Sequence, residues 1–293
     1  MDEPFEAHRA HLRGVAYRML GSIAEAEDAV QEAWLRLHRA DTAGVVNLRG
    51  WLTTVVARVC LDMLRARKAR REDALEVAGA DPVAPPRSPG VDPEEEAVLA
   101  DSVGVALLVV LDTLAPAERL AFVLHDMFDM PFDEIAAITG RSATAARQLA
   151  SRARRRVRGG DASRARAGAS AGDRAAVEGF LTALRAGDVD GLVAVLDPDV
   201  VAHVDAVAGG GTPREVRGAR NWAQGAVAFA RAARFVHLVL VDGAPGLILA
   251  PRGRLQRVLR FTVTGGLITE VAVIADPASL RAMALTLPDP PQL

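Results

Sequence analysis

The sequence predicts a multidomain protein in which two all-α domains are followed by an α+β domain. Apolar residues recur at spacings of three and four in residues 5–71 and again in residues 102–158, which is typical of amphipathic helices. From residue 173 onward, helical stretches are followed by short alternating segments that glycine-containing turns separate. Helices followed by an antiparallel meander indicate the α+β class for this last part.

The composition limits the class of protein. The 293 residues are 50% hydrophobic, which is enough to bury a core. The longest apolar run, residues 103–111, is too short for a membrane span of about 20 residues, and no apolar segment follows the acidic start as in a secretory signal. A single cysteine, Cys60, excludes an internal disulfide and a cysteine-based zinc site. We therefore expect a cytoplasmic protein without a metal or cofactor.

The net charge of −2 is distributed unevenly along the chain. Residues 72–101 hold nine acidic side chains and one arginine, so this stretch has a charge of −8. The remainder of residues 1–172 holds 22 basic and 16 acidic side chains. Two basic blocks on either side of an acidic stretch indicate a surface that attracts polyanions such as nucleic acids.

The first domain, residues 1–71, is expected to consist of helices. Ser22, followed three positions later by Glu25, fits a capping box at a helix N-terminus. Asn47 can cap the next helix, which carries an apolar stripe from Leu48 to Met63. That helix closes with residues 65–71, in which five of seven side chains are basic.

Two stretches of biased composition are expected to be linkers. Residues 72–101 contain five prolines and two glycines besides their acidic side chains, which argues against a packed core. Residues 161–172 are small and polar, as in a flexible connection. The linkers leave three predicted domains: residues 1–71, 102–160 and 173–293.

The second domain contains a helix-turn-helix pattern. A short helix near Phe132 is expected to end at Gly140, since glycine suits the left-handed position that follows a helix. Ser142 is expected to cap a second helix, which carries Arg147 and Gln148. A helix, a glycine-containing turn and a capped second helix are typical of DNA-binding proteins.

The third domain is predicted to be α+β. Helices are expected over residues 175–186, 189–196 and 219–232. Strands are expected near residues 200–207, 235–241, 247–250, 254–264 and 267–274. Hairpin turns are expected at Asp242-Gly243 and Gly265-Gly266.

Blocks of sequence in this order resemble a known family. Residues 28–37 resemble the conserved helix of sigma factor region 2, and residues 48–52 with 57–65 resemble its promoter-facing half. Residues 122–156 resemble region 4, the helix-turn-helix of sigma factors. The chain therefore resembles an extracytoplasmic-function (ECF) RNA polymerase sigma factor of the SigJ-like subgroup, whose C-terminal domain is SnoaL-like, a cone-shaped, NTF2-like fold; residues 173–285 resemble that domain.

The resemblance implies that one helical face binds core RNA polymerase, with β and β′ as the partner subunits. Positions three and four apart share a helix face. A polar helix face taken alone is more often simply solvated, so this assignment depends on the family. The implied polymerase-binding residues are Asp28, Gln31, Glu32 and Arg36.

The resemblance also implies promoter contacts around the −10 element. Residues 41–47 resemble the loop that captures a flipped base, and the basic end of the following helix would meet phosphates. Two alternatives stay open: Trp51 could pack in the core, and Arg58 with Asp62 could form a local ion pair. The implied −10 residues are Asn47, Arg49, Trp51, Arg58, Asp62, Arg65, Arg67 and Lys68.

The second helix of the helix-turn-helix is expected to read the −35 element. Its N-terminal residues would face the major groove, where arginine can pair with guanine and glutamine with adenine. Arginines further along the helix would hold phosphates, which position the protein without specifying a sequence. The implied −35 residues are Arg141, Ser142, Thr144, Arg147, Gln148, Arg152, Arg154 and Arg155.

The C-terminal domain offers one candidate pocket. His203 and Asp205 are two positions apart on an expected strand and so share a face, where a His–Asp pair could do acid–base chemistry. Trp222 and Arg257 could line the same cavity or simply pack. We assign no catalytic residue and expect no enzyme activity, and the ligand of this domain is unknown.

The expected function is therefore that of a sigma factor: the chain would bind core RNA polymerase, recognise −35 and −10 elements and initiate transcription. The C-terminal domain would modulate this activity within the same molecule, and the acidic linker would be either a spacer or a segment threaded through polymerase. A SnoaL-type enzyme tethered to DNA-binding helices and a helix-turn-helix repressor that acts without polymerase are the alternatives.

Overall fold

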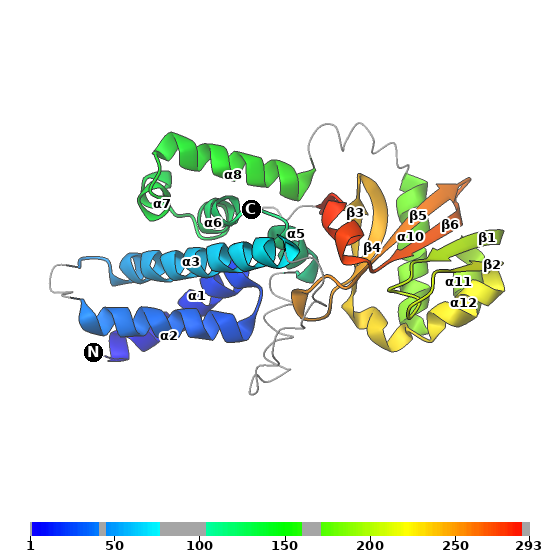
Figure 1. The fold of residues 1–293 in the computed structure, drawn as a ribbon, viewed down its shortest axis with the longest axis horizontal. Helices are drawn as coiled ribbons and strands as arrows, with labels where there is room; N and C mark the ends of the chain where they lie inside the picture. The colour runs from blue at the N-terminus through cyan, green and yellow to red at the C-terminus, as the bar shows by residue number, and fades with distance from the viewer. Residues whose placement is uncertain (1, 41–44, 77–103, 160–170, 289–293) are drawn as a thin grey trace. The chain divides into compact units, whose positions relative to one another are not determined.

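The computed structural model describes residues 2–40, 45–76, 104–159 and 171–288, with side chains from 5 to 70 and through the later ranges (Figure 1). The chain forms two compact units. The helical unit contains the described residues up to 76 together with Leu114–Arg154, and the mixed unit contains Gly104–Thr113 and the described residues from Arg155 onward. The expected loop at 41–44 and most of the two expected linkers lie outside the described residues.

Three helices form the first part of the helical unit: α1 (Asp2–Leu20), α2 (Ile23–Arg39) and α3 (Leu48–Glu76). They pack on one another, and α3 extends past the expected end at residue 71. Ser22 caps α2, with its side chain accepting from the Glu25 amide. The Asn47 side chain likewise accepts from the Gly50 amide at 2.9 Å. Both expected caps are confirmed.

The rest of the helical unit is the expected helix-turn-helix with the helices that support it. α6 (Pro116–Phe122) continues into a π-helical turn, η1 (Val123–Met127), and α7 (Phe132–Thr139) and α8 (Ala143–Arg158) follow. Gly140 has a φ of 67° and lies in the left-handed region, as expected for a residue that ends a helix. Ser142 accepts from the Ala145 amide at 3.2 Å and caps α8.

The two parts of the helical unit share a packed boundary. α3 lies against α6 and α7, and α1 lies against η1. Arg119 of α6 is only 2% exposed. The sequence does not indicate this boundary, because it joins distant residues such as Arg18 and Arg119, which are 101 positions apart.

The mixed unit is built on a seven-stranded sheet of order β2-β1-β6-β5-β4-β3-β7 (Figure 1). The strands are β1 (Leu196–Val204), β2 (Arg214–Arg217), β3 (Val236–Val241), β4 (Ala244–Leu249), β5 (Arg257–Thr264), β6 (Leu267–Ile274) and β7 (Leu285–Thr286). The antiparallel meander β3 to β6 is confirmed. The parallel pairing of β1 with β6 was not predicted, because strand order depends on contacts across 70 residues.

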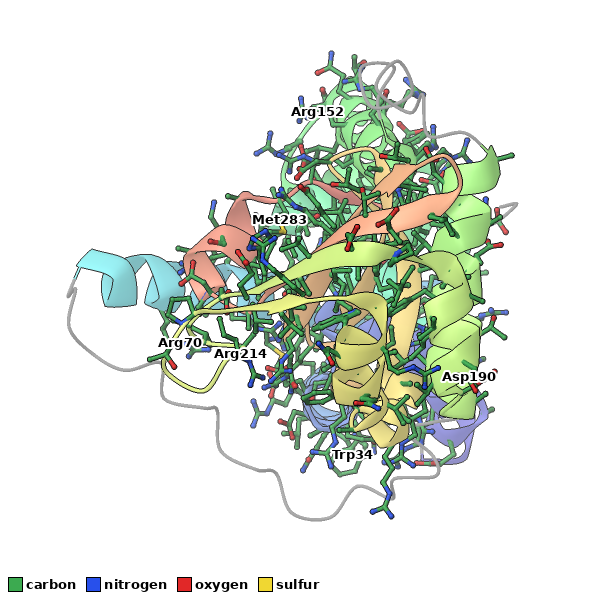
Figure 2. All side chains as sticks on the ribbon, turned by 90° about the vertical axis from the view of Figure 1, so that its right-hand side faces the viewer. Trp34, Arg70, Arg152, Asp190, Arg214 and Met283 are labelled. Atoms are coloured by element: carbon green, nitrogen blue, oxygen red, sulfur yellow. The ribbon has the colours of Figure 1, made fainter. Side chains whose placement is uncertain are left out.

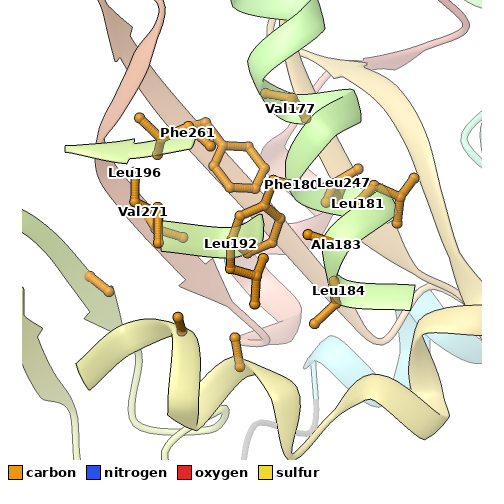
Figure 3. Packing of buried hydrophobic residues seen from close by; sticks show 14 of the residues in the cluster. Val177, Phe180, Leu181, Ala183, Leu184, Leu192, Leu196, Leu247, Phe261 and Val271 are labelled. Carbon is orange, nitrogen blue, oxygen red and sulfur yellow. The ribbon is translucent and has the colours of Figure 1, made fainter. Parts of the chain in front are cut away.

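Helices cover one face of the sheet: α10 (Ala171–Ala186), α11 (Val189–Val195) and α12 (Ala219–Val227). They close a core in which Phe180 and Phe261 lie 5.3 Å apart between ring centroids (Figure 3). The expected helix over 219–232 is instead α12 followed by a tighter 3-10 turn, η2 (Ala230–Phe235). Apolar spacing does not distinguish these two helix types well, because their periods are 3.6 and 3.0 residues.

The mixed unit also takes in a short helix from an earlier part of the chain. α5 (Val105–Asp112) packs against β3 and a 3-10 turn, η3 (Pro251–Gly253). A hydrogen bond of 3.0 Å from the Leu287 amide to the Val157 carbonyl ties the end of α8 to the strand region near β7. A last helix, α13 (Pro277–Ala282), lies between β6 and β7 in sequence.

Candidate nucleic-acid interface

The polar face of α2 is exposed as the helical spacing predicts. Asp28, Gln31 and Arg36 are exposed, and Glu32 is half-buried. Arg36 donates from Nε to the Glu32 carboxylate at 2.8 Å, one turn away. A surface pair of this kind adds little stability, so both charges can be redirected to a partner at small cost. The structure brings these four side chains together on one surface.

Most of the expected −10 residues lie exposed along α3. Asp62 pairs with Arg65 at 3.7 Å, so the structure does not form the alternative ion pair with Arg58. Arg58 instead donates to the main-chain carbonyl of Ala137 in α7 at 3.3 Å. Trp51 is half-buried. The exposed members of the set are Asn47, Arg49, Arg58, Asp62, Arg65 and Lys68.

Arg67 differs from its neighbours on α3 because its side chain is turned inward. It donates to the Glu25 carboxylate at 2.5 Å and to the Leu20 carbonyl at 3.4 Å. Its side chain is 21% exposed. This arginine therefore fastens α3 to the beginning of α2, a contact that sequence spacing could not indicate.

The first turns of α8 present the expected −35 residues to solvent. Arg141, Ser142, Thr144 and Gln148 are exposed. Arg147 is also exposed, and its guanidinium lies over the Phe132 ring at 5.6 Å from the centroid. The buried side of the same helix is made of Ala146, Leu149, Ala150 and Ala153. The helix thus offers polar side chains on the face that a major groove would meet.

Two arginines further along α8 bind carboxylates of the helices beneath. Arg152 donates to Glu118 at 3.0 Å and Arg154 donates to Asp126 at 2.6 Å; Arg152 is labelled on α8 in Figure 2. The two acidic side chains are only 12% and 10% exposed. A buried carboxylate needs its cation, so these contacts hold α8 in place. Arg155 is exposed and remains directed to solvent.

A histidine that the sequence analysis did not single out contacts the −10 set. His11 of α1 lies with Nδ1 at 3.1 Å from Nη2 of Arg49 and with Nε2 at 3.1 Å from Oγ1 of Thr53. Its ring meets Phe128 edge-on at 5.3 Å between centroids. Burial, together with the nearby Arg49 and His8, lowers the pKa of His11. No sequence signal links positions 11 and 49.

The four candidate pocket residues of the C-terminal domain do not meet at one site. Ala202 and Val204 point into the core, so His203 between them lies on the opposite face of the sheet. Trp222 packs against the core on the helix-covered side. The Arg257 guanidinium lies over the Phe229 ring at 5.5 Å.

His203 borders a hollow of about 250 Å³ on the face of the sheet away from that core. Arg260, Asp242 and Glu270 also line it, and His203 faces Glu215 of β2 at 3.6 Å. Asp205 does not line this hollow, but it borders a second, more open one of about 450 Å³ together with His203 and Glu215. His203 and Asp205, which alternation places on one face, therefore share this second hollow, whereas Trp222 and Arg257 line neither of the two.

The Asp205 carboxylate is engaged with the main chain. It accepts from the amides of Ala208, Ala275 and Asp276 at 2.7, 2.6 and 2.8 Å. Desolvation works against the charged form, but these amide donors together outweigh it and lower the pKa of Asp205. A carboxylate stabilised in this way is a poor general base. The geometry supports a structural role that fastens the end of β1 to the start of α13.

The described residues hold no cluster of three or more histidine, cysteine or acidic side chains suited to a metal ion. None of the helices that the structure describes is long and apolar enough to cross a membrane. What the geometry does offer is a helix-turn-helix with an exposed polar face and a long, basic helix packed beside it. Together these define the class of helix-turn-helix transcription proteins.

Comparisons with known proteins narrow this class. Residues 4–70 match Sigma-70 region 2, and residues 104–157 match Sigma-70, region 4. The chain is 37% identical over 289 residues to the probable ECF RNA polymerase sigma factor SigI of Mycobacterium tuberculosis, which covers 97% of this chain and 96% of that protein. The chain belongs to the ECF RNA polymerase sigma factors, transcription initiation factors whose regions 2 and 4 bind core polymerase and promoter DNA.

A second relative is the ECF RNA polymerase sigma factor SigJ of Mycobacterium tuberculosis, 43% identical over 222 residues, or 74% of this chain and 68% of that protein. The crystal structure of that organism's SigJ is 33% identical and aligns over 96% of this chain and 98% of its own, with a TM-score of 0.44. The family expected from the sequence is confirmed, as is the order of two helical sigma domains followed by a domain of helices and a sheet.

Proposed function

We propose that this ECF sigma factor reads the −35 element with the first turns of α8, the −10 element with α3, and core polymerase with the polar face of α2. The mixed unit modulates this activity within the same chain. The chain catalyses no reaction of its own, and its work on polymerase and promoter takes place in the cytoplasm.

The observation that carries the proposal is that the exposed side chains and the arginines bound to carboxylates occupy different parts of α8. Arg141, Arg147 and Gln148 are exposed at its N-terminal end, whereas Arg152 and Arg154 are bound to buried carboxylates. Side chains that hold the helix in place and side chains that face solvent are thus separated along one element. Such a helix can enter a major groove while its orientation is fixed by the helices beneath it.

The −10 surface is proposed on α3. Arg49, Arg58, Arg65 and Lys68 are exposed along it, and they supply the positive charge that phosphates attract. Asn47, just before α3, is the last of residues 41–47, which the family resemblance assigns to base capture. Arg67 is left out of this surface because it binds Glu25.

The polymerase surface is proposed on the neighbouring helix. The polar face of α2 presents two carboxylates, an amide and a guanidinium, and we assign the β′ subunit as their partner: Asp28, Gln31, Glu32 and Arg36. Because the Glu32–Arg36 pair lies within the same helix, each charge can exchange its neighbour for a polymerase side chain without moving the backbone.

Modulation by the mixed unit is proposed through α5. Residues 104–157 match region 4, yet Gly104–Thr113 belong to the mixed unit and α5 packs on β3 and η3. Displacement of β3 or η3 would therefore act on α5, which lies at the start of the residues that match region 4.

Run-off transcription with reconstituted holoenzyme tests the proposal at one fixed salt concentration, with promoters selected from a library. We expect the full chain to initiate, and the double variant Arg147→Ala/Gln148→Ala to lose initiation on promoters that depend on −35 recognition. Arg174→Ala, which changes a partly exposed arginine of α10 that pairs with Glu178 of the same helix, is the control and should initiate normally. Failure of the full chain to bind core polymerase would favour a repressor that acts alone.

A further inference from the structure

A side-chain network joins α1 to the exposed start of α3. The Arg49 guanidinium donates from Nη2 to Nδ1 of His11 at 3.1 Å. The other ring nitrogen, Nε2, lies 3.1 Å from Oγ1 of Thr53. The Thr53 hydroxyl in turn donates to the carbonyl of Arg49 at 2.7 Å, which closes the network on the residue where it began.

The network fixes the protonation of His11. A guanidinium has only donors, so Nδ1 of His11 must be an acceptor without a proton. The Thr53 hydroxyl uses its proton on the Arg49 carbonyl, so Nε2 of His11 is the donor to Oγ1. The ring is therefore neutral, with its proton on Nε2. Burial and the charge of Arg49 lower the pKa of His11, in agreement with this form.

The three residues differ in exposure in an ordered way. Thr53 is 4% exposed, His11 is half-buried, and Arg49 is exposed. The ring of His11 is also held from the side by Phe128 at 5.3 Å. A buried hydroxyl thus fixes a half-buried ring, and the ring fixes a guanidinium at the surface.

We propose that His11 is a positioning residue that orients Arg49 toward promoter DNA at the −10 element. The inference rests on the proposed contact of Arg49 with that DNA. An arginine held by one hydrogen bond still has further donors for a phosphate or a base edge. Because its rotamers are already restricted, it loses less freedom when DNA binds than a mobile arginine would.

Substitutions at position 11 can separate the two ring nitrogens. Asparagine places a carbonyl oxygen near the position of Nδ1 and so keeps an acceptor for Arg49. Glutamine reaches the position of Nε2 and keeps the contact with Thr53. Phenylalanine keeps the ring against Phe128 and removes both hydrogen bonds. A residue with a purely structural role would not distinguish His11→Asn from His11→Gln in DNA binding.

The experiment measures binding of a fluorescent non-template −10 strand to holoenzyme assembled from core polymerase and full-length variants. We expect His11→Gln, His11→Phe and Arg49→Ala each to bind about three- to tenfold more weakly, the range expected when one of two coupled neighbours is lost. His11→Asn should stay within about twofold of the original affinity. The double variant His11→Phe/Arg49→Ala should bind no more weakly than Arg49→Ala alone.

The outcomes separate this inference from the proposed function. If Arg49→Ala weakens binding and His11→Gln does not, the positioning role is overturned while the −10 surface stands. If His11→Asn binds as weakly as His11→Phe, packing rather than the Nδ1 acceptor is responsible and the inference fails. If Arg49→Ala binds normally, both the Arg49 contact and its positioning fail, and the −35 variants still test the proposed function independently. Thermal midpoints of all variants show which of them are folded.

Discussion

Arg119 donates two hydrogen bonds to the main-chain carbonyl of Arg18, from Nε at 3.2 Å and from Nη2 at 3.1 Å. Arg119 is 2% exposed, and the two residues come from α6 and α1. The Arg18 side chain beside it lies over the Phe128 ring at 5.3 Å, and burial lowers the pKa of Arg18. A buried cation therefore joins region 2 to region 4 through a carbonyl.

Replacing Arg119 by leucine should destabilise the helical unit. The Arg18 carbonyl would remain buried without its donors, at a cost of about 3 kcal/mol. Thermal unfolding followed by circular dichroism would show a lower midpoint for Arg119→Leu. Arg231→Ala, which changes an exposed arginine, should alter stability by less than about 0.5 kcal/mol. Equal midpoints for Arg119→Leu and the original chain would contradict this prediction.

Arg154 and Arg155 are adjacent on α8 and should behave in opposite ways. Arg154→Ala would leave the Asp126 carboxylate, 10% exposed, without its cation and should destabilise the helical unit by about 3 kcal/mol. Arg155→Ala should leave stability unchanged and reduce the salt dependence of promoter binding by about one phosphate contact. Urea unfolding and a salt titration of DNA binding measure the two effects. The same stability loss in both variants would argue against the assigned roles.

Sequence recognition at −35 should be carried by the first turns of α8. Arg147→Ala and Gln148→Ala should each reduce discrimination between matched and mismatched −35 bases by about 1–3 kcal/mol, the worth of a bidentate base contact. Competition binding of holoenzyme to promoters with single −35 changes measures this. A uniform loss across all promoters would indicate phosphate contacts instead.

Asp205 should make the stability of the mixed unit depend on pH. Its pKa is lowered in the folded chain, so its stabilisation is complete above the ordinary aspartate value of about 3.9 and is lost as the pH falls through the lower folded value. Asp205→Asn should therefore be less stable than the original chain at pH 7, and the difference should shrink at pH 3. Hydrogen exchange of peptides from the mixed unit measures the stability of both chains at each pH. Asp199→Asn, at an exposed position, should show no such difference.

Truncation after Gly160 should not yield a chain that is intact up to that point. α5 carries buried side chains from Leu107 to Leu111 and packs on β3 and η3, both of which the truncation removes. Residues 105–112 should then lose hydrogen-exchange protection, and the exposed apolar surface should favour aggregation. Unchanged protection of these residues would show that α5 does not need the mixed unit.

The sequence was sufficient for features that depend on neighbouring residues. Ser22, Asn47 and Ser142 were recognised as caps because each bonds an amide only three positions away. Gly140 was recognised because the turn needs a left-handed residue. The meander β3 to β6 is predictable because the turns at Asp242-Gly243 and Gly265-Gly266 join strands that are neighbours in the sequence.

Features that depend on distant residues were not predictable. Arg67 and Arg154 belong to basic runs that look uniform in sequence, yet their partners lie 42 and 28 positions away. Arg49 and His11 are 38 positions apart. Two further features also depend on contacts between distant residues: the parallel placement of β1 beside β6 and the packing of α5 with the mixed unit. Alternation places His203 and Asp205 at one hollow, but it does not show that Trp222 packs on the core and that Arg257 lies over Phe229 instead.

The hydrogen bonds of Asp205 also affect which substitutions the mixed unit can accept during evolution. Its three donors are main-chain amides, and every residue type except proline supplies the same donor at those positions. Substitutions of Ala208, Ala275 or Asp276 therefore leave the bonds available, whereas no substitution at these sites can make good the loss of the carboxylate. Suppressors of Asp205 variants should therefore not arise at these three donor positions.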